Sequence, residues 1–155
     1  MRVFVTSLNV PIGYTTPSFP SLFWPLGNDK PRYEALFLYF SIDIWKFTLY
    51  WSLLFFGGIY LGAGAIAVFN NLFNNYRHSV PILKLSMIGT VVILFSYIIA
   101  GLFKGFALGA VIGLLLSAIY RAGSLTMSTW IPFSWGVAQI LYDICSSYLT
   151  SLIIL

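Results

Sequence analysis

Long apolar stretches dominate the chain after residue 46. Residues 47–76 contain no charged side chain, and a helix needs only about 20 apolar residues to cross the ~30 Å hydrocarbon layer of a bilayer. The asparagine-rich segment 70–78 that follows has the composition of a loop. This pattern predicts a first membrane crossing at residues 47–69.

The next apolar region, residues 82–120, is interrupted only by Lys84 and Lys104. As one helix, its 39 residues would extend about 58 Å, nearly twice the hydrocarbon thickness. A single straight helix is therefore not expected. Two spans, 82–102 and 104–121, joined by a tight turn near residues 101–105, would fit the bilayer and bring Lys104 to one surface.

The two ends of the chain complete the predicted architecture. Residues 1–32 hold five of the prolines and form an irregular, aromatic-rich leader. Residues 33–46 mix charged and apolar side chains, which indicates either an interfacial amphipathic helix or a simple extension of the first crossing. A last span is expected at 132–155. The fold class is thus an all-α transmembrane bundle of three to four spans, the second and third forming a tight hairpin in the four-span case.

Composition agrees with a membrane location and narrows the function. Only 8% of residues are charged and 59% are hydrophobic, whereas soluble domains are about 25% charged. The eight basic residues are scattered along the chain, which argues against nucleic acid as a partner. His78 has no acidic neighbour in sequence, the single Cys145 excludes an internal disulfide, and no metal-ligand or nucleotide-loop spacing occurs. We therefore expect no enzyme activity, no catalytic residues, no metal and no cofactor.

Small residues recur at every fourth position in the third expected span. Residues four apart form one ridge of a helix, and a ridge without side chains lets another helix approach closely. This ridge either packs inside the bundle or receives a partner's helix or a lipid chain. Its members are Gly101, Gly105, Gly109, Gly113 and Ser117.

Asp143 lies about 11 residues into the last expected span, near mid-bilayer depth. A carboxylate at that depth costs several kcal/mol unless it is protonated, paired or facing a polar cavity. Gln139 and Ser147 lie one turn before and after it. With Lys104 and Arg121 placed at span ends, no basic residue is expected at this depth. We call Gln139, Asp143 and Ser147 the polar stripe. It then joins helices through hydrogen bonds, binds a partner or lipid headgroup, or forms part of a transport path.

The expected internal partners of Asp143 are hydroxyl groups on the other spans. They are those of Tyr60, Ser96 and Tyr97.

Several motifs together resemble the transmembrane protein 170 family of eukaryotic endomembrane proteins. The similarity covers roughly residues 40–155, and members of that family are usually described with three spans. Residues 1–39 have no counterpart in the family pattern. The matching residues are Asp43-Ile44-Trp45, Trp51, Ala63-Gly64-x-x-Ala67-x-Phe69, Gly101, Gly109, Tyr120-Arg121-Ala122-Gly123, Met127, Ile131-Pro132-Phe133 and Gln139.

This resemblance implies residence in the endoplasmic reticulum and nuclear envelope, a non-enzymatic role in membrane shape, and association with a larger partner such as a bridge-like lipid-transfer protein. Trp45 and Arg121 join the polar stripe and the glycine ridge as candidate partner- or lipid-binding residues. We expect a membrane adaptor that docks such a partner. The alternative is a small scramblase-like or transporter-like protein that handles lipids or ions along the stripe around Asp143.

Overall fold

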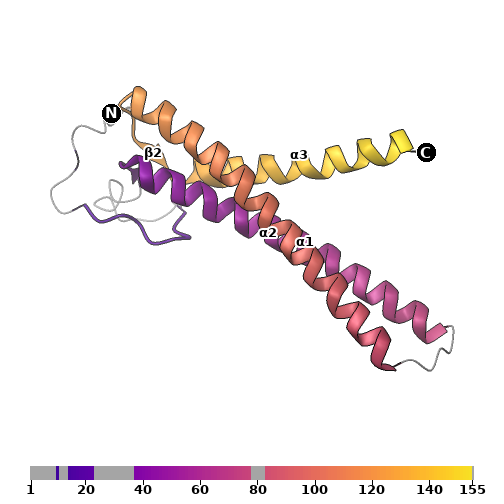
Figure 1. Ribbon diagram of the computed structural model, residues 1–155. Helices are drawn as coiled ribbons and strands as arrows, with labels where there is room; N and C mark the ends of the chain where they lie inside the picture. Colours follow the sequence, from indigo (N-terminus) through magenta and orange to yellow (C-terminus); the bar gives the residue numbers. More distant parts are fainter. Residues whose placement is uncertain (1–9, 11–13, 23–36, 78–82, 155) are drawn as a thin grey trace.

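The computed structural model describes residues 10, 14–22, 37–77 and 83–154. Three helices make up most of this part of the chain, and two two-residue strands form the only sheet within it. Figure 1 labels the elements. In chain order they are strand β1 (Phe37–Leu38), helix α1 (Ser41–Arg77), helix α2 (Leu83–Ala122), strand β2 (Met127–Ser128) and helix α3 (Trp130–Ile154).

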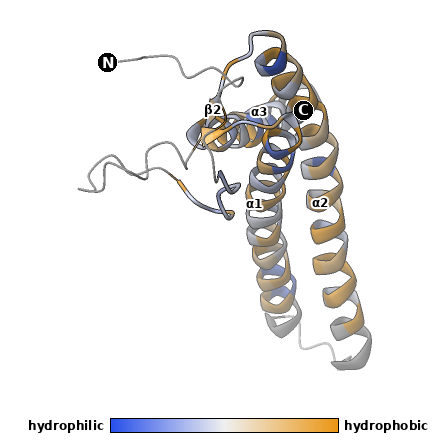
Figure 2. Cartoon of the chain, turned by 90° about the vertical axis from the view of Figure 1, so that its left-hand side faces the viewer, coloured by the Kyte–Doolittle hydropathy of each residue, from blue (hydrophilic) through white to orange (hydrophobic). Residues whose placement is uncertain are grey.

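Helices α1 and α2 form an antiparallel hairpin and lie side by side along their whole length (Figure 1). Both are long and apolar enough to cross a membrane, over Ser41–Asn74 and Ile88–Ala122. In Figure 2 apolar colour covers much of α2 and alternates with paler turns along α1. The expected all-helical fold is confirmed, with two helices of this kind among the described residues.

Helix α2 corrects the prediction of a break near residues 101–105. It is one continuous helix of 40 residues, which corresponds to about 60 Å. The predicted break assumed that a helix ends within the hydrocarbon layer, but a helix can project beyond this layer or tilt. Gly101 and Gly105 lie inside this helix and contact α1, so they serve close packing rather than a turn.

Helix α1 also extends beyond both predicted ends. Of the expected interfacial helix 33–46, residues 33–36 lie outside the described part, residues 37–38 form β1, and Ser41–Lys46 are the first turns of α1. Residues 41–46 are therefore continuous with the helix of the first crossing. At the other end, the expected loop 70–78 is helical as far as Arg77, and Asn71 donates a hydrogen bond to the Thr90 hydroxyl of α2 at 3.3 Å.

A hydrophobic core lies where α1 begins and α2 ends. We call the half of the hairpin at this core, residues 41–60 and 101–122, the proximal half, and the remainder, residues 61–77 and 83–100, the distal half. Partly buried side chains of the leader, α2 and α3 pack around the core. Its buried members are Leu38, Ile44, Phe47, Leu116 and Met127.

The described part of the leader packs against the proximal half. The Phe19 ring lies 5.8 Å from the Phe47 ring and 5.1 Å from the Trp51 ring, measured between centroids. The Tyr14 hydroxyl donates a hydrogen bond to the Phe37 carbonyl at 2.8 Å. Burial, reinforced by the negative charge of Asp43, raises the pKa of Tyr14 to about 12. The phenol therefore remains a donor at physiological pH.

A capped turn leads from α2 to the third helix. Leu125 N–H donates to the Tyr120 carbonyl and Ser124 N–H to the Arg121 carbonyl, with Ser124 at φ 49°. This is the Schellman arrangement that ends many helices. Strand β2 then pairs antiparallel with β1, placing Met127 opposite Leu38, and positions α3 to start beside the first turns of α1.

Candidate polar site between three helices

The glycine ridge of α2 is covered by α1 of the same chain. A Cβ atom built on Gly101 would lie 2.6 Å from Tyr60 Cβ, and one on Gly109 would lie 2.8 Å from Ser52 Cβ. Gly105 and Gly113 make similar contacts with Phe56 and Trp45, and all four glycines are buried. The ridge therefore packs inside the protein, and a partner's helix has no access to it.

Three further candidate residues lie near the same end of the hairpin: Trp45, Ser117 and Arg121. The indole Nε1 of Trp45 donates to the Ala110 carbonyl at 3.2 Å, so this side chain links α1 to α2. Ser117, which continues the ridge, donates to the Leu114 carbonyl of its own helix. Arg121 is exposed in the last turn of α2. Of these three, only Trp45 joins two helices.

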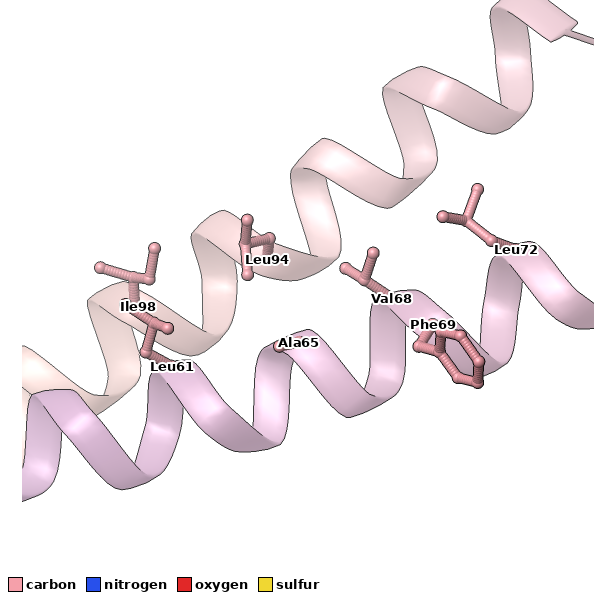
Figure 3. A pocket seen from close by; sticks show the side chains of 7 residues that line it. All are labelled: Leu61, Ala65, Val68, Phe69, Leu72, Leu94 and Ile98. Atoms are coloured by element: carbon pink, nitrogen blue, oxygen red, sulfur yellow. The ribbon is translucent and has the colours of Figure 1, made fainter.

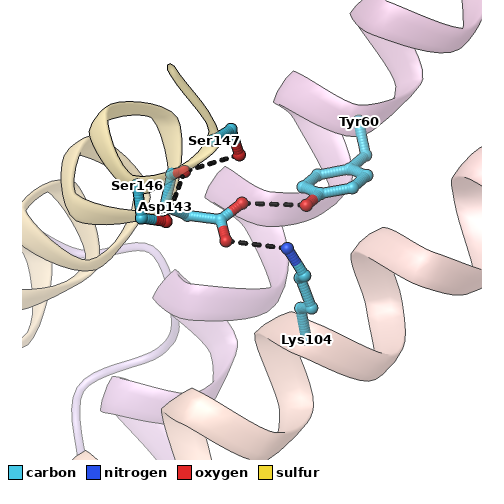
Figure 4. Close-up of polar contacts among 5 residues, drawn as sticks. All are labelled: Tyr60, Lys104, Asp143, Ser146 and Ser147. Atoms are coloured by element: carbon cyan, nitrogen blue, oxygen red, sulfur yellow. Dashed lines mark hydrogen bonds and ion pairs between the residues drawn. The ribbon is translucent and has the colours of Figure 1, made fainter. Parts of the chain in front are cut away.

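Asp143 of α3 is the centre of a polar cluster that joins all three helices (Figure 4). Its Oδ2 accepts a hydrogen bond from the Tyr60 hydroxyl of α1 at 2.8 Å, and its Oδ1 lies 2.8 Å from the Lys104 ammonium of α2. The Lys104 nitrogen is also 5.5 Å from the centre of the Tyr60 ring, within the range of a cation–π contact. The expected contact with Tyr60 is thereby confirmed.

The expectation that no basic residue would reach Asp143 is wrong. It depended on a break in α2 that placed Lys104 at the end of a span, whereas the continuous helix brings Lys104 to the level of Tyr60. Ser96 and Tyr97 do not contact Asp143: Ser96 donates to the Ile93 carbonyl, and Tyr97 packs against Gly64.

Gln139, one turn before Asp143, forms a second polar contact between α3 and α1. Its side-chain amide lies 2.9 Å from the Ser52 hydroxyl, and that hydroxyl lies 2.9 Å from the Thr48 carbonyl. Ser52 and Gln139 are both buried. Gly136, one turn earlier still, lets α3 approach Phe55 and Trp51 closely.

Ser147 does not continue the polar contacts to the hairpin. Its hydroxyl donates to the Asp143 carbonyl of its own helix at 2.8 Å, and the residue is exposed. Of the predicted stripe, Gln139 and Asp143 therefore face the hairpin, whereas the Ser147 hydroxyl bonds within α3.

A shallow apolar groove lies between α1 and α2 in the distal half (Figure 3). Its volume is about 410 Å³. Its lining is almost entirely apolar, so it suits contacts with lipid chains or apolar side chains rather than a polar ligand. The lining residues are Leu61, Ala65, Val68, Phe69, Leu72, Leu94 and Ile98.

Comparison with known proteins identifies the family. Residues 37–155 match the family model described as transmembrane protein 170A/B-like. The chain is also 44% identical over 148 residues to the uncharacterized protein YPR153W of Saccharomyces cerevisiae, which covers 96% of this chain and 95% of that protein. The chain belongs to the transmembrane protein 170A/B-like family. No solved structure matches it.

Membership in the transmembrane protein 170A/B-like family and the two long apolar helices make this an integral membrane protein. The yeast relative matches so much of the chain that the similarity extends into the leader, beyond the part that the family model covers. The family resemblance inferred from the sequence is therefore confirmed.

The polar cluster lies near the middle of the apolar stretch of α1, which corresponds to mid-depth for a helix that crosses a bilayer. Between Lys46 and Asn70, α1 has 23 residues without charge, about 35 Å along its axis, which matches the hydrocarbon layer with a modest tilt. Tyr60 lies thirteen residues after Phe47 and nine before Phe69, or about 20 Å and 14 Å from the two ends of this stretch. Lys104 and Asp143 share its level. Pairing these two charges offsets a cost of about 3 kcal/mol for each one alone.

Proposed function

We propose that this family member is a non-enzymatic membrane adaptor, which shapes the membrane and docks a larger protein. Its proposed residence is the endoplasmic reticulum and nuclear envelope, and its proposed partner is the membrane end of a bridge-like lipid-transfer protein. The family resemblance supports the proposed localisation and partner, and the exposed surface of α3 supports docking, so each can be tested separately.

The observation that carries the docking role is the departure of α3 from the hairpin. Up to Asp143, α3 packs on α1 through Gly136, Gln139 and Asp143. Beyond that point it diverges from α1 and α2 (Figure 1). Exposed apolar and aromatic side chains lie on both sides of Asp143 in α3, with Leu141 at 55% and Tyr142 at 73% before it and Leu149 at 62% after it. An arm of this kind presents apolar and aromatic groups to a membrane-embedded partner.

Native purification of the full-length chain in mild detergent tests the adaptor role. We expect a much larger protein to co-purify in constant proportion, identified by mass spectrometry. Tyr142→Ala together with Leu149→Ala should release it, because large apolar side chains account for most binding energy at interfaces. Val91→Ala together with Val92→Ala, on exposed positions of the distal half, is the matched control and should retain it. A chain that purifies alone at every detergent concentration contradicts the proposal.

A second candidate function is supported by the mid-depth ion pair. Ionisable groups inside a membrane commonly mark substrate or ion paths, and Lys104–Asp143 lies at such a depth. In this candidate the protein moves lipid headgroups past the cluster. Scrambling measured in proteoliposomes should then fall in Asp143→Asn, and the Ser147→Ala control should match the parent. Absence of scrambling by the parent protein contradicts this candidate.

A further inference from the structure

The side chain of Lys104 is more exposed than that of the aspartate with which it pairs. The Lys104 side chain is 46% exposed, whereas that of Asp143 is 13% exposed. An ammonium group has three N–H donors; one donates to Asp143 Oδ1, and the Tyr60 hydroxyl is a second hydrogen-bond partner. Hydrocarbon offers no acceptor to a donor left without a protein partner, and charged groups within a membrane face protein or polar matter. The open side of Lys104 therefore needs an oxygen-bearing ligand.

The charge of Asp143 limits what that ligand can be. A simple anion bound at Lys104 would meet the Asp143 carboxylate, whose oxygen lies 2.8 Å from the ammonium, and would be repelled by it. A ligand that carries adjacent positive and negative groups meets attraction at both residues. The Asp143 carboxylate has about four lone-pair sites and accepts one hydrogen bond from Lys104 and one from Tyr60, so it retains capacity for another donor.

We propose that Lys104 and Asp143 together bind the zwitterionic headgroup of a phospholipid, such as phosphatidylethanolamine. The phosphate accepts hydrogen bonds from Lys104, and the ammonium group of the lipid donates to Asp143, so that four charges of alternating sign lie side by side. The existing ion pair remains intact in the complex. This inference deepens the lipid-handling candidate and rests on the mid-depth position of the cluster: it requires a headgroup to move from the membrane surface to the cluster, but not to cross to the other side.

Native mass spectrometry of the full-length chain tests the site. The protein is extracted in mild detergent from vesicles with equal amounts of phosphatidylethanolamine and phosphatidylglycerol, and retained lipids are counted by headgroup. We expect phosphatidylethanolamine to be retained in preference. In Lys104→Met its binding should weaken about tenfold, equivalent to about 1.4 kcal/mol. The control Phe103→Leu, at an exposed neighbouring position, should bind as the parent does.

A charge exchange separates binding from folding. The double variant Lys104→Asp with Asp143→Lys keeps opposite charges between α2 and α3, but moves the ammonium to the covered position. It should elute as the parent does on size exclusion and still retain little phosphatidylethanolamine. Because this variant keeps the ion pair, the test stands even where Lys104→Met is poorly folded.

Three outcomes would overturn the proposal. They are unchanged retention in both Lys104 variants, equal retention of the anionic lipid, and displacement of bound lipid by millimolar inorganic phosphate, which would indicate a general anion site. Retention of phosphatidylethanolamine by a protein that shows no scrambling would support the binding site and eliminate only the transport candidate. Loss of the co-purifying partner has no bearing on this measurement.

Discussion

The proximal and distal halves of the hairpin use the same two helices but hold them together differently. In the proximal half, the leader, the strand pair and α3 surround α1 and α2, and side chains such as Phe56 and Ile44 are almost fully buried. In the distal half, among side chains described at 61–74 and 88–100, only Gly64 is buried. The proximal half is a small protein core, whereas the distal half is a bare pair of helices.

This difference determines where stability comes from. Lipid tails are as apolar as leucine, so helices in a membrane associate through close packing and hydrogen bonds rather than through the hydrophobic effect. The proximal half has both, through the glycine ridge and the contacts of Trp45, Ser52 and Asp143. The distal half relies on Gly64 against Tyr97 and on the contact between Asn71 and Thr90.

Removal of a large side chain should produce the greatest contrast between the halves. Phe56 is fully buried and Phe95 is 62% exposed. Phe56→Ala should lower the free energy of unfolding by about 4 kcal/mol, as large-to-small core changes do. Phe95→Ala should cost below about 1 kcal/mol, because lipid fills the space. Unfolding in mixed micelles, followed by circular dichroism, compares the two, and equal losses would contradict the division into halves.

Addition of a side chain at a buried glycine should produce the second-largest loss in the free energy of unfolding. Leucine at position 109 would force α1 and α2 apart, because its Cβ alone lies 2.8 Å from Ser52 Cβ. We expect Gly109→Leu to cost about 3 kcal/mol. Gly62→Leu is the control, since nothing lies within 4 Å of a Cβ at that position. The same unfolding measurement applies, and a destabilised Gly62→Leu would indicate that α1 contacts another helix there.

Removal of a single hydrogen bond should also lower the free energy of unfolding, but by less than these packing changes. Trp45→Phe removes the bond to the Ala110 carbonyl and keeps most of the ring, so we expect a loss of about 1 kcal/mol. Asn71→Ala removes a longer bond of 3.3 Å in the distal half and should cost below about 0.5 kcal/mol. Thermal denaturation in one detergent ranks the two variants, and the reverse ranking would refute the comparison.

The smallest predicted effect is a gain in stability at the cap of α2. Ser124 adopts φ 49°, a conformation that residues other than glycine adopt at a cost. Ser124→Gly should therefore raise the free energy of unfolding by about 0.5 kcal/mol. Ser117→Gly, the same exchange within the helix, should lower it by about 0.5 kcal/mol. Opposite signs in paired melting curves are the expected result.

Much of the fold is readable in the spacing of residues. Glycines four apart predicted a close helix contact, and the structure places that ridge against α1. The apolar, charge-poor stretches predicted membrane helices, and two such helices are found. Both features are local patterns along one helix, which is why the sequence alone reveals them.

The errors arose where distant segments meet. A limit on helix length suggested a break in α2, and that break hid the pairing of Lys104 with Asp143, residues 39 positions apart. Tyr60 could be proposed as a partner because it already lay at the right depth of its own span. The packing of Phe19 on Phe47 and Trp51 has no sequence signal, because an irregular leader carries no period from which its position can be inferred.

The uninterrupted run of α1 and α2 has a mechanical consequence. Two helices of 37 and 40 residues, locked together by buried glycines over the proximal half, form a stiff rod that exceeds the hydrocarbon thickness. A pair locked in this way moves as one body, so a tilt that lifts one tip also displaces the other tip.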